Sequence, residues 1–111
     1  MAKYERTITG QFEDVIRRLQ NAIEASAISM NLVDESYYSS GDTKIAVRVY
    51  DKYFMRNKNR ASLSLTAVGN GNKIFISAIG AGGGQGVFFN FSWGAEEQLV
   101  DVVRTCIERM N

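Results

Sequence analysis

The chain has 111 residues, and its thirteen Lys and Arg side chains against twelve Asp and Glu give a net charge of +1. This length predicts one domain, residues 1–111, with one hydrophobic core, and the near-neutral charge excludes general electrostatic attraction to nucleic acid or to an anionic membrane. Because the chain has no histidine, catalysis by histidine and zinc sites with histidine ligands are excluded. The single cysteine cannot form an intrachain disulfide. The lack of a leader or long apolar run predicts a cytoplasmic protein without membrane contact.

The first 28 residues predict a strand followed by a helix. Residues 3–9 alternate weakly, which indicates a short strand ended by Gly10. From Gln11 onward the apolar residues recur at the three- and four-residue spacing of an amphipathic helix, and two acidic residues occupy its first turn. The apolar positions are Phe12, Val15, Ile16, Leu19, Ala22, Ile23 and Ala27.

Residues 29–54 predict two strands joined by a turn at 40–42. Between 29 and 38 apolar residues occur on both parities, so the register stays open and a β-bulge or a twist is expected. Residues 43–54 predict a long strand with Ile45, Val47 and Val49 on one face. The other face would carry Lys44, Arg48, Tyr50 and Lys52 and be open to solvent.

The stretch from Ala61 to the start of the glycine-rich segment at Gly80 predicts a hairpin. Residues 61–68 alternate small or apolar side chains with Ser and Thr, which gives this strand one apolar face. The Asn70–Gly71 pair predicts a type I′ turn. That turn would set Ala67 opposite Ile74 and Leu65 opposite Ile76, so that both strands bury the same face.

A glycine-rich segment, residues 80–86, and an aromatic segment, residues 87–91, precede the second predicted helix. This helix starts at Gly94 and has an apolar stripe through Leu99, Val103 and Ile107. The elements in order, β-α-β-β-β-β-α, predict an α+β two-layer sandwich, an antiparallel sheet with two helices packed on one face. In element order alone, this arrangement is similar to the repeat unit of the TATA-binding-protein-like folds.

Residues 82–86, Gly-Gly-Gly-Gln-Gly, together with residues 91–97, Phe-Ser-Trp-Gly-Ala-Glu-Glu, make a signature. In a chain of this length and element order, the signature resembles a family of small uncharacterised Firmicutes proteins, a domain of unknown function. The resemblance implies a bacterial cytosolic origin. It brings no known activity or catalytic residue.

The glycine-rich loop is the first candidate site. It fits neither phosphate-binding template, because position 85 is Gln and no Gly-Lys-Ser/Thr follows. One interpretation is a binding site for an apolar small molecule between sheet and helices, and the other is a tight structural connection beside core aromatic residues. The ligand-binding candidates are Gly82, Gly83, Gly84, Gln85, Gly86, Phe91 and Trp93.

The long strand supplies the second candidate site. Cationic and aromatic side chains on one sheet face are typical of single-strand nucleic-acid binding, although a solvated sheet face has the same composition. The partner-binding candidates are Lys44, Arg48, Tyr50, Lys52, Phe54 and Phe75. Glu96, Glu97 and Asp101 could bind a hard cation or do acid/base work, but they are expected to be exposed, and helix capping and the helix dipole already account for Glu96 and Glu97. Cys106 is expected to be buried in the helix stripe.

These patterns contain no catalytic constellation, so no catalytic residue, metal site or cofactor is predicted. The sequence favours a non-enzymatic module that binds a partner or forms a homodimer through the open sheet face and its edges. Two alternatives stay open: an apolar small-molecule binder near Trp93, and a weak nucleic-acid binder that uses the basic face.

Overall fold

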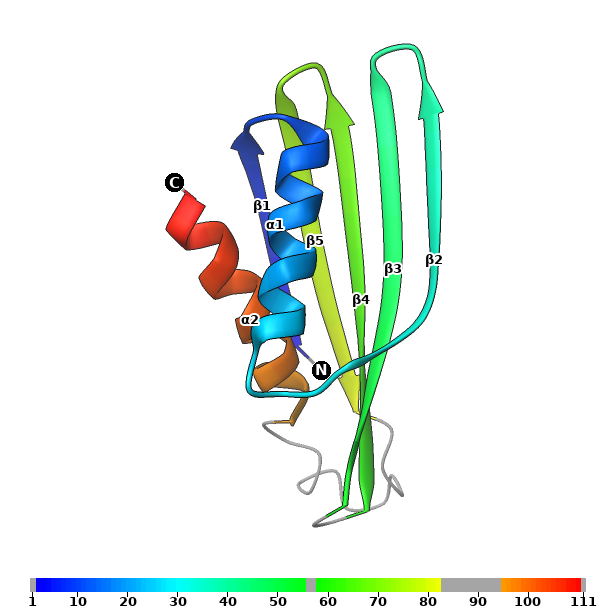
Figure 1. The fold of residues 1–111 in the computed structure, drawn as a ribbon, viewed down its shortest axis with the longest axis vertical. Helices are drawn as coiled ribbons and strands as arrows, with labels where there is room; N and C mark the ends of the chain where they lie inside the picture. The colour runs from blue at the N-terminus through cyan, green and yellow to red at the C-terminus, as the bar shows by residue number, and fades with distance from the viewer. Residues whose placement is uncertain (1, 56–57, 83–94, 111) are drawn as a thin grey trace.

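The computed structural model describes residues 2–55, 58–82 and 95–110, and it confirms the predicted element order (Figure 1). The elements are β1 (Ala2–Thr9), α1 (Phe12–Ala25), β2 (Asn31–Ser40), β3 (Thr43–Phe54), β4 (Asn59–Asn70), β5 (Lys73–Gly82) and α2 (Ala95–Met110). The strands form one sheet in the order β1-β5-β4-β3-β2, and every neighbouring pair is antiparallel.

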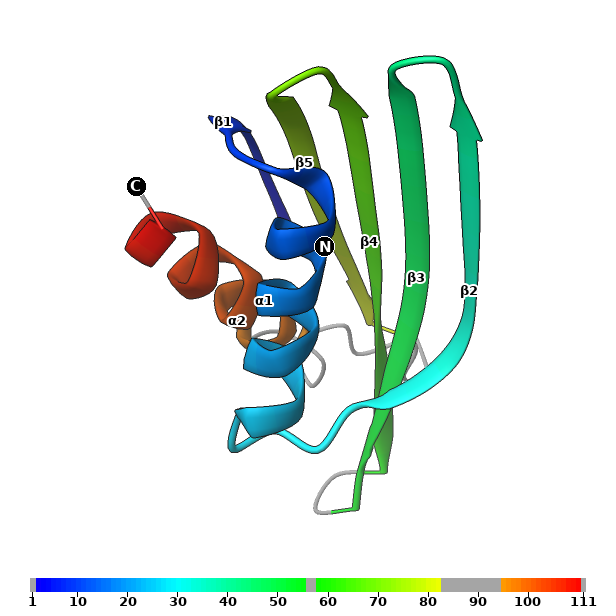
Figure 2. The same ribbon diagram turned by 45° about the horizontal axis from the view of Figure 1, so that its top comes forward.

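Both helices lie on the same side of this sheet, which confirms the two-layer α+β sandwich (Figures 1 and 2). α2 contacts β1, β4 and β5 as well as α1. The helices do not cover the edge strand β2, and every residue of that strand is exposed. We call the sheet surface opposite the helices the open face.

The core lies between the helices and the central strands. The apolar face predicted for residues 61–68 is confirmed, because Leu63 and Leu65 of β4 are buried beside Ile76 of β5. The apolar faces of α1 and α2 pack over these strand residues. Their fully buried members include Leu19 of α1 and Leu99, Val100, Val103 and Ile107 of α2.

The predicted hairpin register is wrong by two residues. Ala67 pairs with Ile76, and Asn70 pairs with Lys73, so the turn consists of Gly71 and Asn72. Gly71 alone in this turn has a positive φ, +62°, the pattern of a type II′ turn with Gly at its first central position. A shift of two residues keeps every side chain on its face, so the core prediction survives.

The face assignment of β3 is also wrong. Arg48 pairs with Leu65 and Tyr50 with Leu63, and residues paired across antiparallel strands share a face. Arg48 and Tyr50 are therefore on the helix side, where they are only 6% and 4% exposed. Ile45, Val47 and Val49 point to the open face instead, together with their partners on β4.

The expected bulge in the second strand is confirmed. The pairing of β2 with β3 shifts between Leu32 and Asp34, which leaves Val33 as the extra residue. The strand starts at Asn31 rather than at residue 29. The bulge explains the conflicting parities, because residues before and after it present opposite alternations to the same face.

Candidate functional site

A row of side chains, apolar or aromatic on four of the five strands, crosses the open face. The pairing of neighbouring strands places Tyr38, Ile45, Val68, Phe75 and Thr7 side by side, one from each strand. We call these residues the apolar row. Tyr38 is 62% exposed and Phe75 is 38% exposed. Large apolar side chains at this exposure on a contiguous surface are typical of protein interaction sites.

The rows beside it are mixed in character. The next row contains Val47 and the third contains Val49 and Ile79, each among Ser or Thr side chains. The third row ends in Asp34 on β2 and in Lys3 on β1. The second row ends in Glu5 on β1, which pairs with Lys3 at 4.0 Å, so the β1 edge carries charges of both signs while Asp34 lies at the β2 edge.

The opposite side of β3 carries a polar cluster. The Arg48 Nε–H group donates to the Tyr50 hydroxyl at 2.8 Å, and its Nη1 donates to the Tyr37 hydroxyl at 2.7 Å. The same Nη1 lies 3.0 Å from Glu35 Oε1, which also accepts a hydrogen bond from Tyr37 at 3.0 Å. Glu35, Tyr37, Arg48 and Tyr50 form what we call the Arg48 cluster.

The surroundings of Arg48, Tyr37 and Tyr50 shift the pKa of each of these groups. Burial opposes the charge on Arg48, but Tyr50, Tyr37 and Glu35 outweigh it and raise the pKa of the guanidinium above its ordinary value. Burial raises the pKa of Tyr50 and Tyr37 as well, so both hydroxyls stay protonated near neutral pH. The cluster therefore satisfies a buried cation, with Arg48 charged and both tyrosine hydroxyls neutral near pH 7.

The six partner-binding candidates do not form one surface. Lys44, Tyr50, Lys52 and Phe54 share the helix side of β3 with Arg48, while Phe75 lies on the open face. Lys44 Nζ contacts Glu13 Oε2 at 2.5 Å and lowers the pKa of that carboxyl group, and Lys52 lies over the Phe54 ring. Five of the six candidates therefore lie on the helix side of the sheet and not on its open face, and nucleic-acid binding through them stays a prediction.

Of the glycine-rich candidates, only Gly82 falls within the described residues, at the end of β5 opposite Ala61. Gly83, Gly84, Gln85, Gly86, Phe91 and Trp93 lie outside them. Their role as a ligand site stays a prediction.

The acidic residues at the start of α2 differ from expectation in one respect. Glu96 is buried, not exposed, because α2 approaches β5 closely at Gly80. Asp101 pairs with Arg104. Among the described residues no group of three potential metal ligands occurs. Cys106 is half-buried and faces the space between the two helices.

Sequence reasoning misses the apolar row. The alternation of Ile45, Val47 and Val49 is visible in the sequence, but it predicts the core side of its strand. Val68 and Phe75 could have indicated the row, because both are apolar and both lie on the face opposite to the buried face of their strands. Two strands with apolar residues on both faces indicate a second apolar surface.

One solved structure is similar to this chain. No curated protein matches the chain. The crystal structure of TTHA0849 from Thermus thermophilus is similar at 12% sequence identity over 96% of this chain and 91% of that chain, with a TM-score of 0.36. Among the described helices, none is long and apolar enough to cross a bilayer.

The family comparison covers all of the sequence. The model of a family of unknown function, DUF6054, matches residues 1–111. This agrees with the resemblance drawn from the glycine-rich signature to a domain of unknown function. The chain belongs to the DUF6054 family.

Proposed function

We propose that the protein is a non-enzymatic module that associates with a second copy of itself through the open face. The observation that supports this proposal is the apolar row, which runs from β2 to β1. An antiparallel sheet with a solvated outer face normally alternates apolar and polar residues, with the polar ones outward. Here the outward residues at the middle of the row are Ile45, Val68 and Phe75.

The size of the face fits a small dimer interface. Five strands spaced about 4.8 Å apart, taken over the 8-residue length of β1 at about 3.3 Å per residue, present about 600 Å² per partner. Two such faces bury about 1,200 Å² in total, at the lower end of stable interfaces. Sheets that stack face to face in this way lie about 10 Å apart with interdigitated side chains.

The charges at the two ends of the third row, Lys3 and Asp34, favour a second copy as the occupant. Consider a two-fold axis that runs parallel to the strands between the two sheets, above β4. It brings β1 of one copy over β2 of the other, because β4 is the middle strand. Lys3 then faces Asp34 of the second copy, Phe75 faces Ile45, and Val68 faces itself. Opposite charges meet at both edges while apolar residues meet in the centre.

The test is sedimentation velocity at tens of micromolar protein. We expect the wild-type protein to sediment as a dimer, and we expect Phe75→Lys to sediment as a monomer because it places a charge in the centre of the contact. Met55→Lys is the matched control. Met55 is the most exposed large apolar residue described and lies beyond the end of β3, outside the apolar row.

A wild-type protein that is monomeric at these concentrations contradicts the proposal. So does a Phe75→Lys protein that remains as dimeric as Met55→Lys. Circular dichroism of each variant verifies that the exposed substitution has not unfolded the sheet.

A further inference from the structure

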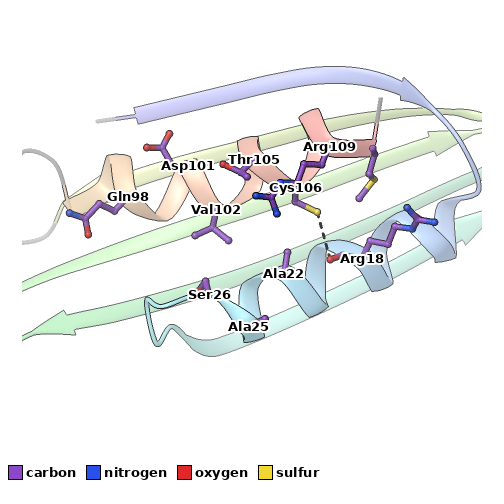
Figure 3. Close-up of a pocket in the computed structure, with 11 residues that line it drawn as sticks. Arg18, Ala22, Ala25, Ser26, Gln98, Asp101, Val102, Thr105, Cys106 and Arg109 are labelled. Atoms are coloured by element: carbon purple, nitrogen blue, oxygen red, sulfur yellow. Dashed lines mark hydrogen bonds between the residues drawn. The ribbon is translucent and has the colours of Figure 1, made fainter.

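A groove of about 560 Å³ runs between α1 and α2 on the side of the helices that faces away from the sheet (Figure 3). The helices are closest where α1 ends and α2 begins, and they diverge toward the C-terminus of α2 (Figures 1 and 2). The groove exists because the apolar residues that α1 presents to it are Ala22 and Ala25, whose side chains are too short to meet Val102 and Met110 of α2. Its volume lies within the range of about 300–1,000 Å³ typical of small-molecule sites.

The groove is apolar along its floor and positive at its rim. Arg18 and Arg109 line it, and Asp101 is the only acidic residue of the described chain that does. Arg18 pairs with Asp14, its Nε 3.1 Å from Oδ2, and Asp101 pairs with Arg104, which is outside the groove. Within the described part of the chain, no ion pair engages Arg109. The lining therefore carries an excess positive charge beside an apolar surface.

Cys106 lies between the two arginines. Its thiol contacts the Arg18 carbonyl oxygen at 3.7 Å (Figure 3). Burial raises the pKa of this thiol above its ordinary value, while the charges of Arg18 and Arg109 act to lower it. Cys106 is the only cysteine in the chain, so its chemical reactivity reports on this groove alone.

We propose that the groove binds an anionic amphiphile of the fatty-carboxylate class. The alkyl chain would lie over Ala22, Ala25 and Val102, and the carboxylate would accept hydrogen bonds from the Arg109 guanidinium, the donor that suits a carboxylate best. An uncharged apolar ligand would leave Arg109 unused. This site is on the opposite side of the molecule from the apolar row, so it stands independently of self-association.

Decanoate is the probe, used below its micelle-forming concentration, and decanol of the same chain length is its uncharged control. We expect decanoate to slow the labelling of Cys106 by a maleimide at least fivefold at saturation, and decanol to do so weakly. Isothermal titration calorimetry gives the dissociation constant for each ligand and each variant.

Three variants locate the site. Arg109→Gln is expected to weaken decanoate binding about tenfold while leaving decanol binding unchanged, because it removes a charge-assisted hydrogen bond. Ala22→Leu fills the groove and is expected to abolish binding of both. Arg17→Gln is the matched control, since Arg17 also pairs with Asp14 but does not line the groove, and it is expected to bind decanoate as the wild type does.

Several outcomes overturn the proposal. One is a labelling rate that decanoate leaves unchanged. Another is equal affinity for decanoate and decanol, or an Arg109→Gln protein that binds decanoate as tightly as Arg17→Gln, since either result means that the groove takes any apolar chain. A third is protection of Cys106 that grows with protein concentration in the absence of ligand, which would assign the groove to a second copy of the chain.

Discussion

At the residue scale, Arg48 is a buried charged residue whose neighbours satisfy its guanidinium group. A guanidinium beside Leu65 on the helix side would be costly if it were unpaired, because burial removes its hydration. Two tyrosine hydroxyls and the Glu35 carboxylate replace that hydration, and the Arg48 guanidinium also lies 5.7 Å from the centre of the Tyr50 ring. The cluster also joins the exposed strand β2 to the core side of β3.

We predict that Arg48→Met lowers the free energy of unfolding by about 1–3 kcal/mol, because it leaves the buried Tyr50 hydroxyl without its donor. Methionine keeps most of the packed volume, so the change reports on hydrogen bonding. Urea denaturation measures the effect. The control is Arg60→Met, which removes an exposed pair with Asp51 and is expected to cost less than about 1 kcal/mol. Equal losses for the two variants would show that the cluster contributes no more than a surface ion pair.

At the scale of elements, the close contact between α2 and β5 at Gly80 sets the position of the helix on the sheet. A Cβ atom added at Gly80 would lie 2.8 Å from the Glu96 carbonyl oxygen and 3.0 Å from a Val100 methyl group. The carbonyl belongs to the backbone of the first turn of α2 and cannot rotate away. Gly80 therefore allows the start of α2 to contact the strand directly, which buries Glu96 in the process.

We predict that Gly80→Ala destabilises the protein by about 1–3 kcal/mol, because the helix must shift to relieve the overlap. Thermal unfolding followed by circular dichroism measures the change. Ser64→Ala is the control, since Ser64 lies on the open face of the neighbouring strand, away from α2, and its replacement is expected to have little effect. A Gly80→Ala protein as stable as the Ser64→Ala protein would contradict the close approach.

At the scale of the whole molecule, the two sides of the sheet serve different purposes. Helices cover β1, β5 and β4 on one side, and the other side carries the apolar row across all five strands. The proposed two-fold arrangement assigns a partner to each residue of that row, and it also places Lys3 opposite Asp34 at the ends of the third row. It therefore makes a prediction about charge that does not depend on the apolar contacts.

We predict that Lys3→Asp and Asp34→Lys each weaken the dimer about fivefold, because each variant places like charges opposite one another at both edges. The double variant exchanges the two charges and is expected to restore wild-type association. Sedimentation equilibrium at low and high salt measures the dissociation constants, and the differences should shrink as salt rises. A double variant that associates more weakly than either single variant would rule out this orientation of the two copies.

The sequence alone determined the features that depend on local periodicity. The apolar stripes of both helices, the single apolar face of residues 61–68, the bulge in β2 and the order of elements all followed from the spacing of apolar residues and turn formers. These features survive because each is set by residues close together in the chain.

The tertiary structure decided which face of β3 meets the helices. Ala46, Arg48 and Tyr50 alternate with Ile45, Val47 and Val49, and period-two alternation cannot tell a core side from an open side when both contain apolar groups. Pairing with β4 settles it, because Leu63 and Leu65 can be buried only beneath the helices. The apolar row, the Arg48 cluster and the groove between α1 and α2 all depend on such contacts between distant segments, so no local pattern could locate them.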